Sequence, residues 1–422
     1  MLKWLKWKNK ECNSRVQWFY LPGSEYNSHF HIYYEWVRTA NDNGVPIQLL
    51  YIIPYSRYKE YRQEFISRTR LPNVRAVVLP DFKYGRMLTM YLRYVTWNSS
   101  TVIHARHFNI DALKGLRVRM DGRLRILYEL EGDIVSEVEF LRENPNPYAS
   151  YEKIMTGNGY LDNQRSIVEN CDMLSLVSNG FKAVIEKRYD GLIASDDIVV
   201  LPTGGKAYEN HKLDKSIRSQ IRKEYGFTGK YIVNYTGNVF YTWSQFDRCL
   251  EAFLLIKKNI AVNSHFLAMV PEAGHEIARK YFEEYSIARE DYTLIEVDSK
   301  KLKDMLLASD IGLLLRPEHI SMLCGSPGKF CDYVSSGLPV LMNTYAGDYS
   351  GMVLRDGLFP LVQDVNSDSD ILECVNLLYK YSWEQRLGIV EWAEQKIMTR
   401  VYADEYVSVL SKLAISTNNS LA

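Results

Sequence analysis

The segment Ser326–Val340, SPGKFCDYVSSGLPV, carries the pattern that decides the fold of this chain. The residues just before Pro327 are expected to start a helix with Pro327 at its first position, because the fixed backbone angle of proline suits that place. Unpaired backbone amides and the helix dipole make such an end a binding site for anions. Gly328 leaves the surface bare, and Lys329 adds a positive charge. The segment therefore predicts a site for a diphosphate.

Two further residues extend this interpretation to a nucleotide. Asp332 lies six residues after Ser326, and its carboxylate can accept two hydrogen bonds from a ribose diol, as acidic residues do in dinucleotide sites. A capped helix with a surface Asp and Lys explains the same residues without a ligand, so both interpretations stay open. Gly237 follows the apolar run YIVNYT and lets the backbone approach a bound group closely, although a simple turn is the alternative.

Apolar runs alternate with amphipathic stretches on both sides of this segment, which is typical of parallel sheets covered by helices. In the first half, strands are predicted at residues 16–22, 47–53, 74–80, 100–106, 125–131, 173–178 and 197–202. In the second half, they are predicted at 231–237, 265–270, 292–297, 310–317 and 338–343. We therefore expect two doubly wound, Rossmann-like α/β domains, with ligands in the cleft between them at the carboxyl ends of the strands.

Composition excludes some classes of function. The 422 residues include 51 Lys+Arg and 51 Asp+Glu, and this zero net charge argues against a nucleic-acid partner. Six cysteines without a CxxC pair predict free thiols in a reducing compartment. No apolar run reaches the roughly 18 residues that span a bilayer, so a cytoplasmic location is expected. The first ten residues, MLKWLKWKNK, suit peripheral contact with the inner face of a membrane, and an unstructured tail is the alternative.

The segment around Lys329 resembles the donor-site signature of GT-B-fold glycosyltransferases, especially the retaining family 4 (glycosyl transferases group 1), whose helix often reads S-P-x-K-x-x-E-Y before a Gly and a Pro-Val strand. The matching residues are Ser326, Pro327, Lys329, Tyr333, Gly337, Pro339 and Val340, with Asp332 where Glu is usual. Flanking stretches such as NYTGNVFYTWSQF and NTYAGDYSGMVLRDG resemble the family in the same order, over about 230 residues in all.

The resemblance implies a domain plan and a reaction. Residues 1–205 would form the acceptor-binding domain and residues 206–390 the donor-binding domain, while helices in 391–422 would pack back toward the first domain. The implied reaction moves a sugar from a nucleoside diphosphate sugar, the co-substrate, to a hydroxyl of a carbohydrate, lipid-linked or protein acceptor, with retention and in bacterial surface glycan or glycoprotein assembly. No other cofactor is expected.

The resemblance also implies site residues. The expected donor-binding residues are Gly237, Asn238, Arg316, Gly325, Ser326, Pro327, Gly328, Lys329 and Asp332. The catalytic residues are not identified, and the candidates are Lys329, Arg316, Glu131, Asp133 and His104. His104 and Arg106 resemble a family strand near the cleft, and Glu131 and Asp133 stand where many members contact the donor sugar. Buried structural roles for His104 and Arg106 are the alternative.

Departures from the family pattern keep other functions open. Cys324 stands where the first of two glutamates is usual, and NVFYTWSQF lacks the basic residues that often hold the diphosphate. A glycosyltransferase-like binding subunit without activity and a nucleotide-sugar epimerase on the same fold are therefore the alternatives. His29-x-His31 and His104-x2-His107 have ligand-like spacing but no accompanying Cys or carboxylate cluster, so no bound metal is expected.

Overall fold

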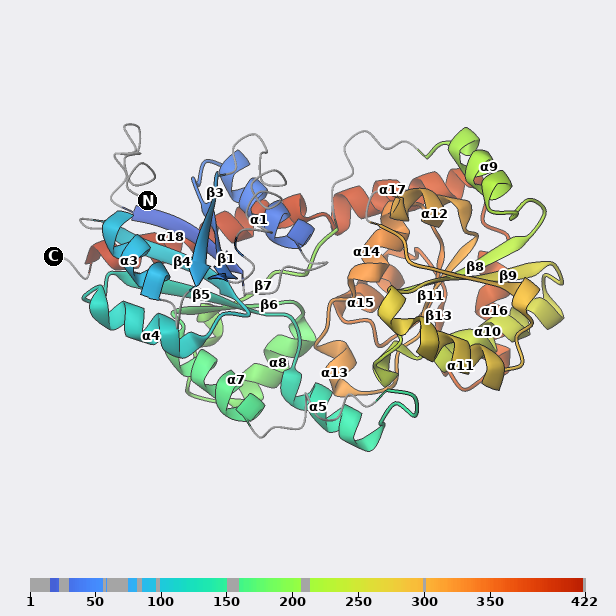
Figure 1. Cartoon of the computed structure of the whole chain (residues 1–422), viewed down its shortest axis with the longest axis horizontal. Coiled ribbons are helices and arrows are strands. Elements are labelled where there is room, and N and C mark those ends of the chain that lie inside the picture. Colours follow the sequence, from blue (N-terminus) through green and yellow to red (C-terminus); the bar gives the residue numbers. More distant parts are fainter. Residues whose placement is uncertain are drawn as a thin grey trace.

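The structure is a computed structural model that describes residues 16–22, 30–55, 58, 75–81, 86–95, 99–149, 159–205, 213–298 and 301–419. The predicted membrane segment 1–10, His29 and most of the predicted interdomain linker, residues 206–212, lie outside the described residues. The described part contains two parallel sheets, each covered by helices (Figure 1). We call the first sheet with its helices the N-terminal domain and the second the C-terminal domain.

The N-terminal sheet has the strand order β3-β2-β1-β4-β5-β6-β7. Its strands are β1 Val16–Pro22, β2 Gln48–Pro54, β3 Arg75–Asp81, β4 Ser100–Arg106, β5 Leu124–Leu130, β6 Met173–Leu176 and β7 Ile198–Val200. Its helices are α1 Phe30–Asp42, α3 Arg86–Val95, α4 Ile110–Arg119, α5 Ile134–Glu143, α7 Gly159–Asn170 and α8 Asn179–Arg188, with a short 3-10 turn η2 at Ser195–Asp197. All seven residues of β4 are buried, as expected for a central strand covered on both faces.

The C-terminal sheet has the order β10-β9-β8-β11-β12-β13. Its strands are β8 Tyr231–Thr236, β9 Ser264–Met269, β10 Tyr292–Ile295, β11 Ile311–Leu314, β12 Val340–Asn343 and β13 Leu361–Val362. Its helices are α9 Lys215–Glu224, α10 Phe246–Asn259, α11 His275–Glu284, α12 Leu302–Ala308, α13 Ile320–Leu323, α14 Gly328–Ser335, α15 Asp348–Asp356 and α16 Asp368–Leu378, with 3-10 turns η3 Thr242–Ser244, η4 Glu272–Gly274 and η5 Arg289–Asp291.

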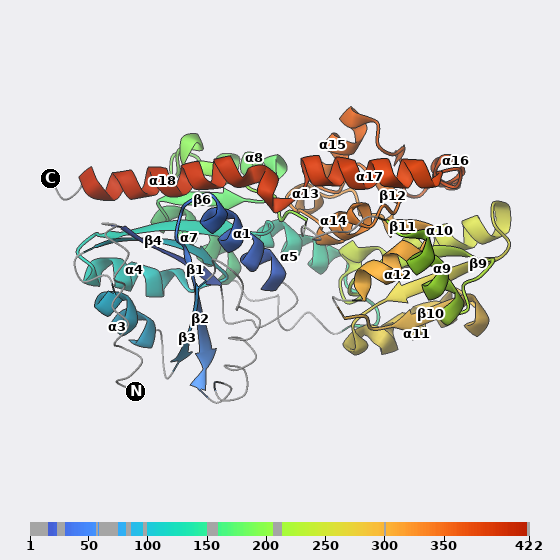
Figure 2. The same cartoon turned by 90° about the horizontal axis from the view of Figure 1, so that it is seen from above.

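The last helices connect the two domains. Helix α17 (Trp383–Lys396) lies on the C-terminal domain, and after the turn η6 (Thr399–Tyr402) helix α18 (Ala403–Asn419) lies on the N-terminal domain (Figure 2). Tyr406 and Leu410 of α18 are fully buried in the core on one face of the N-terminal sheet. At the crossing, the amide of Gly205 donates to Ile397 O at 2.7 Å. The chain thus passes between the domains twice, side by side.

Most strand predictions agree with the structure to within a few residues, and the differences have local causes. The strand predicted at 173–178 ends at Leu176, because Ser178 accepts the amide of Phe181 and caps α8. The strand predicted at 197–202 is reduced to Ile198–Val200, and Pro202, which lacks an amide hydrogen, lies beyond its end. Helix α14 begins at Gly328 with Pro327 as its N-cap, one residue later than predicted.

Candidate functional site

A lysine from α14 lies over the loop that follows β8. Gly237 directly follows β8 and has a φ of 128°, and a Cβ placed there would lie 3.2 Å from Lys329 Nζ. The same Nζ lies 4.3 Å from the centroid of the buried Tyr235 ring, within the range of a cation–π contact. A larger residue at 237 would push this lysine away. Gly237 and Lys329, about 90 positions apart in the sequence, therefore belong to one site.

Arg316 supplies a second positive charge. It follows β11, where Asn343 at the end of β12 clamps its backbone: Arg316 N donates to Asn343 Oδ1 at 3.2 Å, and Asn343 Nδ2 donates to Arg316 O at 2.8 Å. The Arg316 guanidinium donates to Trp243 O at 3.1 Å. Burial and the charge of Arg316 lower the pKa of Lys329 to about 7, and burial lowers the pKa of Arg316. Two cations held this close disfavour each other, and a polyanion would relieve the repulsion.

No carboxylate forms an ion pair with Arg316 or Lys329 among the residues that the structure describes. Glu137, in the first turn of α5, is nevertheless near enough to influence Arg316. Burial and the charge of Asp133 raise the pKa of Glu137 to about 7, and Arg316 opposes this rise. Glu137 is not among the site residues predicted from the sequence, although its place one turn into the helix after β5 was a usable signal. The N-terminal domain thus contributes a titratable carboxyl beside the two cations.

The start of α14 differs in detail from the expectation. The α14 N-cap makes no side-chain hydrogen bond, so the first amides of the helix are not capped by a hydroxyl. Ser326 instead turns away: its Oγ accepts the amide of Thr203 at 3.1 Å and donates to Tyr349 OH at 3.0 Å. The Ser326 side chain therefore contacts the interdomain crossing, while the prediction that its backbone amide meets an anion stays a prediction.

The other predicted donor residues surround the same loops. Asn238 O accepts from Tyr235 OH at 2.7 Å, and Asn238 Oδ1 accepts the amide of Phe240 at 3.0 Å, which shapes the turn after Gly237. Gly325 lies directly against Gly347, whose Cβ position would be 2.0 Å from Gly325 O. Gly328 has open space around its Cβ position. Asp332 is half-buried on α14, one turn after Lys329.

His104 is not placed in the cleft. Its side chain is 1% exposed, with Nδ1 2.8 Å from Tyr406 OH of α18 and Nε2 3.2 Å from Glu129 Oε2. Arg106 is fully buried and donates to Glu129 Oε1 at 2.7 Å. Burial raises the pKa of Glu129, but Arg106 and His104 outweigh it and lower that pKa to about 2. These residues form a buried ion network that fastens α18 to the sheet, which corrects the expectation that His104 and Arg106 face the cleft.

Glu131 and Asp133 are also engaged within the N-terminal domain. Glu131 pairs with Arg106 and His107. Asp133 is fully buried, caps α5 through the amide of Ser136 and binds Arg188, with Arg188 Nη2 2.7 Å from its Oδ2. Burial acts to raise the pKa of Asp133, but the hydrogen bonds from Arg188, Ser136 and Gln164 have the larger effect. The pKa of this carboxyl is therefore below its usual value. A carboxylate held by so many donors is a structural anchor, so the catalytic roles expected for Asp133 and Glu131 have no support in this geometry.

Helix α13 of the C-terminal domain packs against the N-terminal domain. Its neighbours are α5 and α8. Ser178 Oγ donates to Leu323 O at 2.8 Å, and a Cβ on Gly180 would lie 2.6 Å from that same oxygen. Cys324 is fully buried within the core of the N-terminal domain, and burial raises the pKa of its thiol to about 12. Cys324 is therefore a packing residue between the domains rather than a nucleophile.

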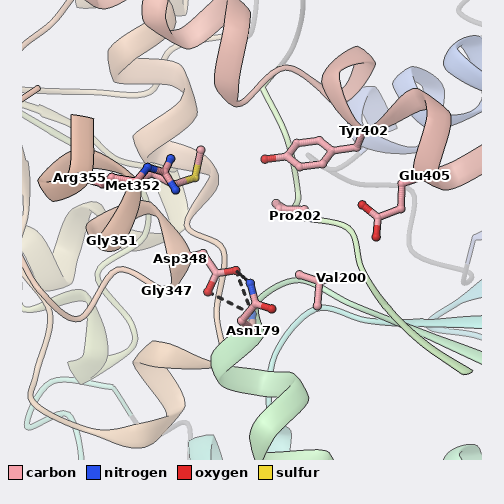
Figure 3. A pocket seen from close by; sticks show the side chains of 10 residues that line it. All are labelled: Asn179, Val200, Pro202, Gly347, Asp348, Gly351, Met352, Arg355, Tyr402 and Glu405. Atoms are coloured by element: carbon pink, nitrogen blue, oxygen red, sulfur yellow. Dashed lines mark hydrogen bonds between the residues drawn. The ribbon is translucent and has the colours of Figure 1, made fainter. Parts of the chain in front are cut away.

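A hollow lies beside the crossing, between α15 and the residues around Pro202 and Tyr402 (Figure 3). Its volume is about 670 Å³. It is lined by Asn179, Val200, Pro202, Gly347, Asp348, Gly351, Met352, Arg355, Tyr402 and Glu405. The Asp348 carboxylate accepts the Asn179 amide at 2.9 Å and Asn179 Nδ2 at 2.8 Å (Figure 3). Tyr349 of α15 stacks on Phe330 of α14, so α15 packs against the helix that carries Lys329.

Solved structures of glycosyltransferases share this fold. Alr3699/HepE from Anabaena in complex with UDP-glucose aligns with a TM-score of 0.63 and 11% identity, over 94% of this chain and 99% of that one. WaaG, a glycosyltransferase involved in lipopolysaccharide biosynthesis, aligns at 0.58 and 14%, over 94% and 98%. The α,α-trehalose 6-phosphate synthase from Burkholderia multivorans aligns at 0.60 and 11%, over 95% and 99%.

The chain has the GT-B fold of these enzymes, as predicted. No family model matches the chain. No curated protein matches it either. At these identities the likeness establishes the fold alone.

The described residues contain no group of three or more His, Cys, Asp or Glu side chains that could hold a metal ion. None of the helices in the described ranges is long and apolar enough to cross a membrane.

Proposed function

We propose that this chain is a glycosyltransferase that moves a sugar from a nucleoside diphosphate sugar to an acceptor hydroxyl. The observation that carries the proposal is a pair of neighbouring cations, Lys329 over Gly237 and Arg316 after β11, which have no partner carboxylate among the described residues. Negative charge builds on the leaving diphosphate during transfer, and fixed positive groups at that position lower the barrier. The HepE complex with UDP-glucose supports a nucleotide sugar as the donor.

In this proposal each group has one task. Lys329, Arg316 and the free amides that begin at Gly328 hold the diphosphate, and Asp332 accepts the ribose hydroxyls. The bond from the anomeric carbon to the diphosphate oxygen breaks, and a bond to the acceptor oxygen forms. The acceptor proton needs a base, and Glu137, with a pKa of about 7, is the described carboxyl near Arg316 that suits this role.

The finer parts of the proposal follow the resemblance. Transfer with retention fits a site without a protein nucleophile, and the buried thiol of Cys324 does not supply one. The acceptor would bind to the N-terminal domain and the reaction would proceed without a metal. Motion about Gly204, whose φ is 71°, would close the cleft and exclude water. A role in bacterial surface glycan assembly, at the cytoplasmic side of a membrane, is part of the same proposal.

Donor turnover tests this proposal directly. Purified protein would be incubated with UDP-, GDP- and TDP-sugars, with hydrolysis and transfer to acceptors measured separately. We expect turnover with at least one donor. We also expect Asp332→Ala to weaken binding of the matching nucleoside diphosphate about tenfold, the loss of roughly one or two ribose hydrogen bonds. Asp111→Ala, at an exposed carboxylate of α4, is the matched control.

The alternatives give different results in the same assay. Nucleotide binding without turnover of any donor would reject the enzyme and identify a binding subunit, which the buried Cys324 favours because no carboxylate stands at that place. Conversion of the donor to an epimeric nucleotide sugar without an acceptor would identify an epimerase instead.

A further inference from the structure

Three arginines converge at the edge of the C-terminal sheet opposite the cleft. Arg218 and Arg222 come from α9, and Arg386 comes from α17 (Figure 1). They surround the end of α12 and Asp310, which directly precedes β11. Because Tyr231 begins β8 and Asp310 precedes β11, this cluster lies at the amino ends of the strands. It is therefore separated from Lys329 and Arg316 by the length of the sheet.

The three guanidiniums hold the end of α12 through its carbonyl groups. Arg222 Nη1 donates to Ala308 O at 2.8 Å, Arg218 Nη1 to Ser309 O at 2.7 Å, and Arg386 Nη1 to Ser309 O at 2.9 Å. The end of a helix carries about half a negative charge, so these contacts are favourable. These contacts satisfy much of the hydrogen-bonding capacity of the three arginines but neutralise only part of their positive charge.

The only carboxylate that pairs with these arginines in the described residues is fully engaged. Asp310 Oδ1 accepts from Arg218, and Oδ2 accepts from Arg222 at 3.0 Å and from the amide of Ile232 at 2.7 Å. Three cations therefore face one carboxylate and one helix end, which leaves an excess of about one and a half positive charges. Burial and the charge of Arg218 lower the pKa of Arg386 to about 9, as expected where cations outnumber anions.

Two polar atoms beside this cluster have no hydrogen-bond partner among the residues that the structure describes. They are Nε of Arg386, whose side chain is 95% buried, and the hydroxyl of Tyr231. Both residues line a cavity of about 150 Å³. Its other walls are Arg218, Asp310, Pro339, Leu378, Tyr379, Tyr381 and Trp383. An unpaired buried donor is unfavourable, and both of these atoms can donate to an oxyanion.

We propose that this cavity is a binding site for a phosphate group, either as free phosphate or as the monoester of a larger molecule. The cavity is many times larger than the space one water needs, and its excess charge matches a dianion. Arg218 and Arg386 would contribute the charge, while Nε of Arg386 and the Tyr231 hydroxyl would donate to the phosphate oxygens. The bound group would fasten α9 and α17 together, and α17 leads directly to the crossing at Gly205 and Met398. The site does not depend on the proposed transferase activity.

Calorimetric titration with inorganic phosphate and with glycerol 3-phosphate tests the site. A Lys329→Met background removes one cation of the cleft, so that phosphate binding there is suppressed. We expect saturable binding to persist in this background and Tyr231→Phe to weaken it about tenfold, the loss of one hydrogen bond to a charged group. Arg386→Lys keeps the charge but removes Nε and is expected to weaken binding similarly. Arg279→Gln, at an exposed position of α11, is the control and should leave phosphate binding unchanged.

The two ligands distinguish the source of the phosphate. Binding of glycerol 3-phosphate at least as tight as that of inorganic phosphate would support a monoester, and exclusive binding of inorganic phosphate would support the free ion. The proposal is overturned if neither ligand binds saturably in the Lys329→Met background, or if binding is unchanged by Tyr231→Phe. Because Tyr231→Phe removes a single oxygen, it keeps the test valid if Arg386→Lys fails to fold.

Discussion

Replacement of Lys329 by Met should separate the binding of a nucleoside diphosphate from the stability of the fold. Burial of Lys329 and repulsion by the charge of Arg316 lower the pKa of its ammonium to about 7. In the ligand-free protein this lysine is therefore about half protonated at neutral pH. A diphosphate favours the protonated form, so binding takes up a proton.

The magnitude follows from these facts. A hydrogen bond to a charged group contributes about 1.5–3 kcal/mol, so Lys329→Met should weaken UDP binding at pH 6 by about 10- to 100-fold. Above pH 7 the wild type must first protonate Lys329, and its dissociation constant should rise about tenfold per pH unit. The two proteins should converge between about pH 8 and 9, where the bound lysine also loses its proton. Arg316 keeps its charge and preserves weak binding in both.

The effect of Lys329→Met on the stability of the fold should be opposite to its effect on UDP binding. The folded pKa of Lys329 lies below its ordinary value of 10.5, so the unfolded chain binds more protons between pH 7 and 10.5, and stability from this group rises with pH over that window. Lys329→Met should therefore raise the melting temperature of the ligand-free protein at pH 6 while it weakens UDP binding.

Isothermal titration with UDP from pH 6 to 9 and thermal unfolding at pH 6 measure both effects. Lys258→Met, at an exposed position of α10, is the control. A wild-type dissociation constant that does not change with pH, or an equal pH slope in Lys329→Met, would refute this reasoning.

Three further predictions address the carboxyl, the domain contact and the last helix. Because burial raises the pKa of Glu137 to about 7, the stability of the protein should fall as the pH rises from about 4.5 to 7. In Glu137→Gln the melting temperature should depend less on pH over this range, and an unchanged pH dependence would contradict the prediction. Gly180→Ala places a Cβ 2.6 Å from a carbonyl oxygen of α13 and should destabilise the folded protein by about 1–3 kcal/mol. Gly388→Ala, with open space around its Cβ, is the control and should not destabilise it. Equal urea midpoints for the two variants would exclude the contact at Gly180. Tyr406→Phe leaves His104 Nδ1 unpaired and should cost about 1–3 kcal/mol in urea unfolding, without loss of UDP affinity.

The order of the strands was predictable because local pattern determines it. Buried parallel strands are runs of apolar residues, and the segments at 16–22 and 100–106 were predicted with the bounds that the structure has. The helix that carries Lys329 was recognisable from its Pro, Gly and Lys residues. Gly237 and Lys329 also belong to the same site, because parallel strands bring the residues at their carboxyl ends to one edge.

Side-chain direction was not predictable in the same way. His104 and Arg106 follow the family pattern in sequence, yet α18, about 300 residues later, covers their strand and buries both in an ion network with Glu129. The sequence marked Glu137 only by its place in the first turn of the helix after β5, and its proximity to Arg316 of the other domain became known only from the structure. Contacts between distant segments decide these roles, and a local pattern carries no record of them.

The segment around Lys329 shows where the two kinds of information meet. By itself the sequence determined that a helix starts there after a strand, with a glycine, a lysine and an aspartate in its first turns, because helix starts and turns depend on neighbouring residues. Only the tertiary structure decided that Lys329 lies over Gly237, that Ser326 turns to the crossing at Thr203, and that Cys324 enters the opposite core. The physical reason is that direction and burial are set by the elements that pack against a segment, and those elements come from far along the chain.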